Sequence, residues 1–161
     1  MGWYHKITVV AALVALAGCQ KAAPELAASD VAAVKANYTD WAAAVANRDF
    51  SAVAKLVTAD IWAFQPDQPA IVGREAIVAW TKTWPPDFRQ TWVVDEVGGY
   101  LDLAFSRATV TESWALPDGK RETEQAVCVS IHRRQPDGTW QFSRSISHAL
   151  KPPPAPPTDK R

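Results

Sequence analysis

The sequence predicts an α+β domain in which a curled antiparallel sheet covers three helices. Helical spacings dominate residues 29–84, where one short strand interrupts them. Residues 90–150 instead show strand patterns separated by turn signals. A run of helices followed by a run of strands is typical of α+β folds with the helices on one face of an antiparallel sheet. We therefore expect the order helix, helix, strand, helix and four strands, with the sheet curled into a cone that is open at one end.

The first helix is expected to begin at the N-cap pair Ser29-Asp30 and to end near residues 47–49. Its apolar residues are spaced by four, three and four positions, so they share one face of the helix. These residues are Val34, Tyr38, Trp41 and Val45. The sheet is the element available to cover this face.

Two shorter helices follow. Residues 51–57 read as the second helix. The third begins at Gly73 and is ended by Pro85-Pro86, because the residue before a proline is disfavoured in the α conformation. Trp80 lies on its apolar face together with Ile77.

A short strand, residues 60–64, lies between the second and third helices and is stopped by Pro66. It carries two aromatic side chains, Trp62 and Phe64, which share one face because side chains alternate along a strand. The sequence leaves open which face of this strand points into the cone.

Four longer strands make up the second half. They are expected at residues 90–97, 100–116, 120–134 and 139–150. Gly98-Gly99 is expected to turn the first into the second. Pro-Asp-Gly at residues 117–119 and again at 136–138 is a strong turn signal, because proline fixes φ and glycine accepts positive φ. The strands therefore form an antiparallel meander.

The last strand alternates strictly between two kinds of residue. One face would carry Trp140, Phe142, Arg144, Ile146 and His148, and the other Gln141 and three serines. A large apolar face with a few convergent polar groups is typical of a ligand pocket wall. We therefore expect Arg144 and His148 to face the interior of the cone.

The composition is that of one ordinary globular domain. Of 161 residues, 48% are hydrophobic and 21% are charged, and the 17 basic side chains equal the 17 acidic ones. No basic run is present, so we expect no nucleic-acid partner. The 8 Trp are the unusual feature, because Trp usually marks core packing or an interface.

The amino-terminal segment is predicted to be a targeting signal rather than part of the folded domain. Residues 1–18 combine a basic start with a short apolar run and a small-residue exit, which is a secretory signal. Leu16-Ala17-Gly18-Cys19 resembles the lipobox of bacterial lipoproteins, which implies a lipid on Cys19. The alternative is an ordinary signal peptide that happens to contain a cysteine. Gln20 follows, and in that family a residue other than Asp there implies an outer membrane lipoprotein facing the periplasm.

The rest of the chain is expected to divide into three segments. Residues 19–28 are expected to be a tether, residues 29–150 the folded domain and residues 151–161 a disordered proline-rich tail. With Cys19 lipidated, Cys128 has no partner for a disulfide and is expected to be a buried, inert thiol.

Residues 29–149 resemble the nuclear-transport-factor-2-like superfamily, in its ketosteroid-isomerase and SnoaL-like branch. The resemblance rests on Ala46-Asn47-Arg48-Asp49, on Leu56 to Asp60, on Val72 to Ile77, on Asp102-Leu103-Ala104 and on Asp137 to Phe142. It implies a cone-shaped fold that is frequently a homodimer through the outer face of its sheet. It does not imply one function, because the superfamily includes isomerases, dehydratases, cyclases and binding or dimerisation modules.

The catalytic pattern of that branch is incomplete here. Ketosteroid-isomerase-like members place a proton-shuttling carboxylate just after the first strand, and the matching position is Gln65, whose amide cannot shuttle protons. Cyclase-like members often place an acid on a late strand, but residues 139–150 contain none. Both departures lead us to expect a protein that is not an enzyme.

Two polar residues remain as candidates. Arg144 either binds an anionic group or pairs with an acid on a neighbouring strand: Asp102, Glu112, Glu122 or Glu124. His148 either donates a hydrogen bond or proton to a ligand, or is an exposed residue at the strand end. His132, followed by Arg133-Arg134, is expected at the solvated end of a hairpin.

Seven aromatic side chains are available to wall the cone, although core packing is the plainer interpretation of each. They are Tyr38, Trp41, Trp62, Phe64, Trp80, Trp92 and Phe142. No cofactor is expected, and the two histidines beyond the signal do not make a metal ligand set.

Three hypotheses follow. The first is a lipid-anchored periplasmic domain that binds a small, mostly apolar or anionic molecule without turnover. The second is an isomerase, dehydratase or cyclase that uses His148, with Tyr38 as a possible second group. The third is a dimeric interaction module whose cone is filled by its own side chains.

Overall fold

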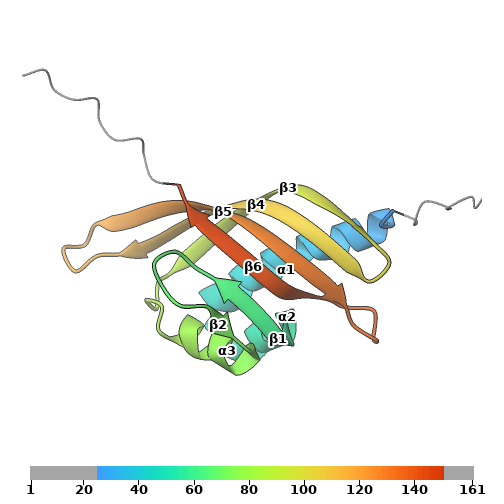
Figure 1. Ribbon diagram of the computed structural model, residues 1–161. Coiled ribbons are helices and arrows are strands. Elements are labelled where there is room, and N and C mark those ends of the chain that lie inside the picture. The colour runs from blue at the N-terminus through green and yellow to red at the C-terminus, as the bar shows by residue number, and fades with distance from the viewer. Residues whose placement is uncertain (1–24, 151–161) are drawn as a thin grey trace, which may run out of the picture.

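The computed structural model describes residues 25–150 (Figure 1). The predicted signal peptide (1–18), Cys19, most of the predicted tether and the predicted tail (151–161) lie outside the described residues. The helices are α1 (Ala28–Ala46), α2 (Phe50–Leu56) and α3 (Arg74–Lys82). The strands are β1 (Val57–Phe64), β2 (Ile71–Val72), β3 (Arg89–Tyr100), β4 (Leu103–Ala115), β5 (Arg121–Arg134) and β6 (Trp140–Ala149). The α+β class is thereby confirmed.

The strands form one curled sheet in the order β2-β1-β6-β5-β4-β3. From β3 to β6 the sheet is the predicted antiparallel meander. The sheet is not antiparallel throughout, because β1 pairs with β6 in parallel, a pairing that the sequence did not predict. No hairpin joins these two strands, so the chain direction of β1 is not tied to that of its neighbour. The two-residue β2 was not predicted and pairs with the end of β1.

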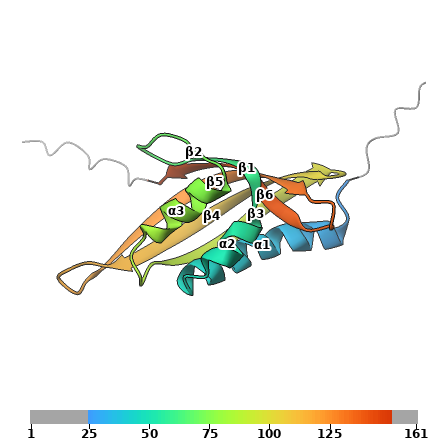
Figure 2. The ribbon, with the colours of Figure 1, turned by 90° about the horizontal axis from the view of Figure 1, so that it is seen from below.

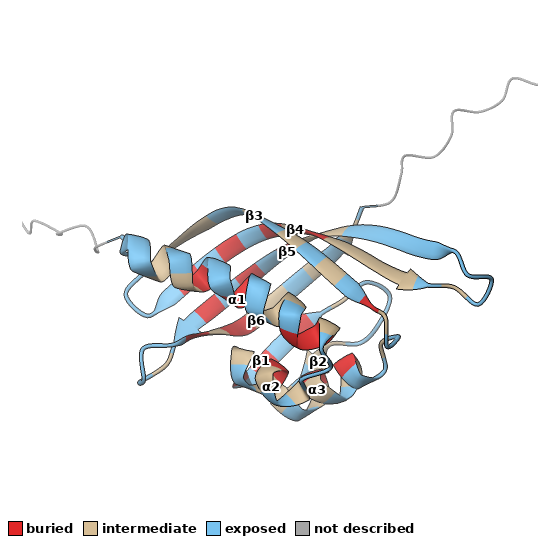
Figure 3. Ribbon diagram, turned by 180° about the vertical axis from the view of Figure 1, so that it is seen from behind, coloured by how far each residue is buried: buried red, intermediate tan, exposed pale blue. Residues whose placement is uncertain are grey.

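All three helices lie on the same side of the sheet (Figure 2). The long helix α1 runs across that side, and the buried positions of the strands gather beneath it (Figure 3). The predicted stripe of α1 is confirmed, since Val34, Tyr38 and Val45 are buried and Trp41 packs against the same core. The core therefore fills the space between α1 and the concave face of the sheet.

The start of α1 differs from the prediction. The helix begins at Ala28 without a side-chain cap, and Asp30 is used for tertiary contacts. Its carboxylate accepts a hydrogen bond from the Trp140 indole at 3.2 Å and pairs with Arg134 at 3.1 Å. The end of the predicted tether also lies against the domain, because Leu26 packs beside Val34.

The two Pro-Asp-Gly turns are confirmed between β4 and β5 and between β5 and β6. The first turn is not at Gly98-Gly99 but at residues 101–102, so β3 is longer than predicted. Both glycines lie inside the β3–β4 ladder, where Gly98 faces Phe105 and Gly99 faces Ala104. The glycines therefore allow β3 and β4 to approach each other closely, and they do not form the turn.

Candidate functional site

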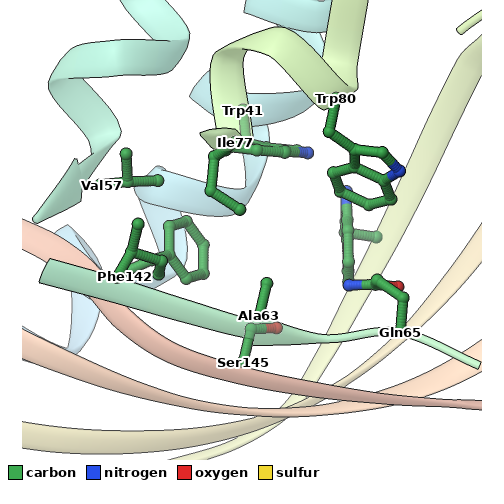
Figure 4. A pocket seen from close by; sticks show the side chains of 10 residues that line it. Trp41, Val57, Ala63, Gln65, Ile77, Trp80, Phe142 and Ser145 are labelled. Atoms are coloured by element: carbon green, nitrogen blue, oxygen red, sulfur yellow. The ribbon is translucent and has the colours of Figure 1, made fainter. Parts of the chain in front are cut away.

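A cavity opens between the helices and the inner face of the sheet. Its volume is about 60 Å³. Four aromatic side chains form much of its wall: Trp41, Trp80, Trp92 and Phe142. Figure 4 shows Trp80 and Gln65 on one side and Val57 and Phe142 on the other, with Ala63 and Ser145 forming the sheet side. The cavity is therefore apolar, with one amide and one hydroxyl as its polar groups.

Two wider cavities adjoin it at the open end of the cone. Their volumes are about 270 and 770 Å³, and both share Gln65 and Trp80 with the inner cavity. Both also include Glu112 of β4. We call Gln65, Trp80 and Glu112 the mouth, because Gln65 and Trp80 line all three cavities and Glu112 lines both of the wider ones.

A chain of hydrogen bonds holds the mouth carboxylate. The Trp41 indole donates to Gln90 Oε1 at 2.9 Å, and Gln90 Nε2 donates to Glu112 Oε1 at 2.7 Å. Burial raises the pKa of Glu112, the hydrogen bond from Gln90 lowers it, and repulsion from Glu124 raises it further. Glu112 is thus a positioned carboxylate with a raised pKa that lines both wider cavities.

A second polar network lies beneath the cavity. The Tyr38 hydroxyl is 2.7 Å from Ser106 Oγ, which is 2.8 Å from His132 Nε2. Burial raises the pKa of Tyr38 and lowers that of His132 to about 4, so both groups are neutral near pH 7. The Phe142 ring contacts both, with centroids 5.0 Å from Tyr38 and 4.6 Å from His132. None of the three network residues lines the inner cavity.

The structure brings together only some of the predicted pocket residues. Trp41, Trp80, Trp92 and Phe142 line the inner cavity. Tyr38 is buried below it. Trp62 and Phe64 are each 42% exposed on the opposite face of the sheet, because Ile61 and Ala63 are the inward residues of β1.

The prediction that Arg144 and His148 face the cone is wrong. The β5–β6 register shifts between His132, which faces Phe142, and Ile131, which faces Arg144, so Ser143 is an extra residue. Such a bulge reverses the faces of all residues that follow it. Arg144, Ile146 and His148 therefore lie on the outer face, and Ser145 takes the inward place.

Outside the cone, Arg144 has partners of its own. It donates to the Asp60 carbonyl at 3.0 Å and lies 3.6 Å from the Asp60 carboxylate. The predicted structural ion pair therefore exists, but with an acid of β1 rather than any of the four acids considered. His148 is exposed, and an anion site inside the cone formed by these two residues is excluded.

Two candidate functional residues were not predicted from the sequence. His132 was expected in solvent, but it is fully buried. Glu112 was considered only as an ion-pair partner, although it interrupts an inward series of β4 that includes Val110 and Trp114. An acid on an otherwise apolar face was the available signal. This signal was hard to recognise because Leu103 and Phe105 make the outer face of β4 apolar as well, so the sequence did not show which face points inward.

No other reactive group stands out in residues 25–150. Burial raises the pKa of the Cys128 thiol to about 11, so this cysteine is the inert thiol that was predicted. Within that range no three His, Cys, Asp or Glu side chains converge as a metal site. None of the helices in this part of the chain is long and apolar enough to cross a membrane.

Similar structures fix the fold but span several activities. A ketosteroid isomerase-like protein from Erwinia carotovora atroseptica has a TM-score of 0.67 at 20% identity, over 78% of this chain and 100% of the other. The hexachlorocyclohexane dehydrochlorinase LinA-type3 from Novosphingobium barchaimii has 0.66 at 20%, over 76% and 88%. The CaMKII hub of S. rosetta has 0.65 at 17%, over 74% and 95%. At such identities the likeness concerns the fold alone.

Sequence comparison is more specific about the family. No curated protein matches the sequence. The SnoaL-like domain family does match, over residues 26–142, from the residue that packs beside α1 to the aromatic side chain in the cavity wall. The match covers most of the described chain and contains the whole mouth. The chain therefore belongs to the SnoaL-like domain family.

Proposed function

We propose that this protein binds a small, mostly apolar molecule in its cone and does not convert it. The observation that carries the proposal is the aromatic-walled inner cavity that opens through Gln65 and Trp80 into wider space. A concave apolar site with few polar groups is typical of small-molecule binding. The indole N–H of Trp92 adds support, since it is buried without an acceptor among the described residues and so offers a ligand a donor.

The size of the cavity limits the ligand. Pockets for drug-sized molecules have volumes of roughly 300–1,000 Å³, whereas the inner cavity has about 60 Å³. That volume corresponds to about four to six water-sized spheres. A ligand would therefore place only a small group inside, with the rest of it in the wider cavities of the mouth.

A second candidate function is proton-transfer catalysis by Glu112. It replaces the expected use of His148, which lies on the outer face. Its support is the raised pKa of Glu112 together with the hydrogen bond that orients it. Binding ranks first because the ten residues that line the inner cavity include no acid, histidine or cysteine.

Native mass spectrometry of the full chain, released from its own cells into mild detergent, tests the binding function. We expect a discrete adduct that is lost on activation. Trp80→Leu should reduce the adduct to a small fraction, whereas the same change on the outer face, Trp62→Leu, should leave it intact. A clean mass in the wild type, with no small molecule bound under any extraction, would refute ligand binding and favour a filled cone.

We further propose that the protein works at the cell envelope, anchored to the outer membrane through a lipid on Cys19 and facing the periplasm. The support is the signal-like segment that ends in Leu16-Ala17-Gly18-Cys19. Such an anchor would hold a binding domain beside the membrane while residues 29–150 remain in the periplasm.

A homodimer through the outer face of the sheet completes the proposal. Two rows of side chains cross four strands there: Phe105, Ile131, Arg144 and Trp62, then Arg107, Val129, Ile146 and Phe64. The six apolar members are between 37% and 56% exposed. Each row has one arginine, and Asp60 and Glu96 border them, so the face can meet a second copy of itself without unbalanced charge.

A further inference from the structure

The charged side chains that line the cavities at the open end of the cone are all negative. Four acids line the wider cavities: Asp67, Glu112, Glu122 and Glu124, of which Glu112 borders both. No lysine or arginine of residues 25–150 lines these three cavities. None forms an ion pair with Glu112, Glu122 or Glu124 in that part of the chain. His148 borders only a neighbouring cavity, which it shares with Asp67.

Strand pairing holds two of these carboxylates against each other. Glu112 of β4 lies directly opposite Glu124 of β5. Like charges directly opposite on a sheet are destabilising, and no lysine or arginine of residues 25–150 forms an ion pair that would offset the cost of this pair. A bound positive charge beside both carboxylates would offset it. Glu112 is also fixed in place by Gln90, so it would not have to be ordered when a ligand binds.

The aromatic wall suits the same kind of ligand. Trp80, which lines all three cavities, meets the ring of Trp84 at a centroid distance of 4.6 Å and an angle of 80°. Trp84 lines one of the wider cavities with Trp80. Two indoles set nearly perpendicular form a corner of π faces, and such faces attract organic cations strongly when water is excluded.

We propose that the mouth binds a small organic cation of the alkylammonium or quaternary ammonium class. Its cationic head lies against Trp80, and Glu112 and Glu124 balance its charge. This inference rests on the proposed binding function and specifies its ligand. It replaces the anionic ligand considered from the sequence, because Arg144 lies outside the cone.

Choline and its uncharged carbon isostere, dimethylbutanol, separate charge from shape. Each is titrated into the full chain in mild detergent, with tryptophan fluorescence and calorimetry as readouts. We expect choline to bind at least about tenfold more tightly than dimethylbutanol, because only choline carries the positive charge that the carboxylates would balance. Glu112→Gln should weaken choline binding at least about tenfold and leave dimethylbutanol binding unchanged.

Two further variants keep the test decisive. Glu124→Gln removes the opposite, exposed carboxylate and should also weaken choline binding, so the result does not depend on one variant folding. Asp102→Asn is the matched control, because Asp102 is exposed ten residues away from Glu112 at the other end of β4, roughly 34 Å along the strand. It should leave choline binding unchanged.

The contrary outcomes are distinct. Equal binding of both probes, or wild-type choline affinity in Glu112→Gln and Glu124→Gln, would overturn the cation assignment and leave the proposed binding function standing. Absence of choline binding while native mass spectrometry still finds an adduct would do the same. Absence of both probes and of any adduct would overturn the binding function itself.

Discussion

At the scale of single residues, His132 shows how burial sets the chemistry of a side chain. Its ring is fully buried on β5 and its Nε2 lies 2.8 Å from Ser106 Oγ. Desolvation lowers its pKa from 6.5 to about 4, because a charged imidazolium would lose its hydration there. The unfolded chain therefore takes up a proton before the folded protein does.

This difference predicts a loss of stability in mild acid. The contribution of His132 is fully present above pH 6.5 and is lost as the pH falls from 6.5 towards 4. Between about pH 7.5 and about pH 4.5 the loss from this one group is about 2 to 3 kcal/mol. His132→Gln, which keeps a polar partner for Ser106, should remove that part of the pH dependence in urea unfolding.

The comparison concerns slopes rather than absolute stabilities, because any change at a buried site also alters packing. His148→Gln is the control, since it removes an exposed imidazole from the outer face and leaves the core unchanged. An unchanged pH dependence in His132→Gln would show that His132 takes up its proton over the same pH range in the folded and the unfolded chain.

Residues on helices were the part of the site that could be predicted. Trp41 and Trp80 lie on stripes with a helical period, and such stripes face the core whatever the details of the sheet. Glu112 could not be singled out, because its role depends on Gln90 and Glu124, which reach it only through strand pairing. Its functional meaning comes from cross-strand neighbours that no spacing within β4 reveals.

At the scale of elements, β6 shows why alternation alone can mislead. The sequence pattern of this strand is strictly periodic, and its first inward residues, Trp140 and Phe142, are buried as predicted. A single extra residue at Ser143 then moves Arg144 and every second residue after it to the other face. Bulges depend on the pairing with neighbouring strands, so the strand's own sequence did not reveal this one.

The β3–β4 ladder offers a prediction at the same scale. Gly99 has φ +150, and a Cβ there would overlap the Leu103 carbonyl oxygen and lie 2.7 Å from Ala104 Cα. Because both contacts are backbone, neither can move without opening the ladder. Gly99→Ala should therefore lower the free energy of unfolding by about 2 to 4 kcal/mol, measured by urea denaturation.

Gly119→Ala is the matched control for this effect. Gly119 also has positive φ, at +81, but a Cβ there meets nothing within 4 Å. Its replacement should cost only about 1 kcal/mol, the conformational penalty of a left-handed alanine. Equal losses for the two variants would mean that strand separation at Gly99 is not the cause.

At the scale of the whole molecule, the outer face predicts a dimer that a single charge can break. Ile146 is 56% exposed in one of the two rows of the outer face. In a twofold interface each substitution occurs twice, so Ile146→Glu would bring two carboxylates into the contact. We expect sedimentation to show a dimer for the wild type and a dissociation constant raised at least about thirtyfold for the variant.

The same charge placed on the helical side serves as the control. Ala36 is exposed on α1, which lies on the opposite side of the sheet. Ala36→Glu should leave the dimer unchanged. A wild-type chain that sediments as a monomer at every concentration, or an Ile146→Glu chain that dimerises normally, would exclude the outer face as the interface.

Membrane attachment is the last prediction, and it concerns Cys19, which lies outside the described residues. If Cys19 carries the lipid, wild-type cells fed a labelled fatty acid should yield a labelled protein that pellets with membranes and is released by detergent. Cys19→Ala should carry no label and remain in the soluble periplasmic fraction.

The second cysteine supplies the matched control for this experiment. Cys128 is buried on β5, where its sulfur lies 3.0 Å from Ser147 Oγ, so Cys128→Ser should keep both the label and the membrane fraction. An unlabelled, soluble wild type would instead establish the ordinary signal peptide. Because that outcome leaves the cone intact, the choline titration and the fractionation would then separate what this domain binds from where it is held.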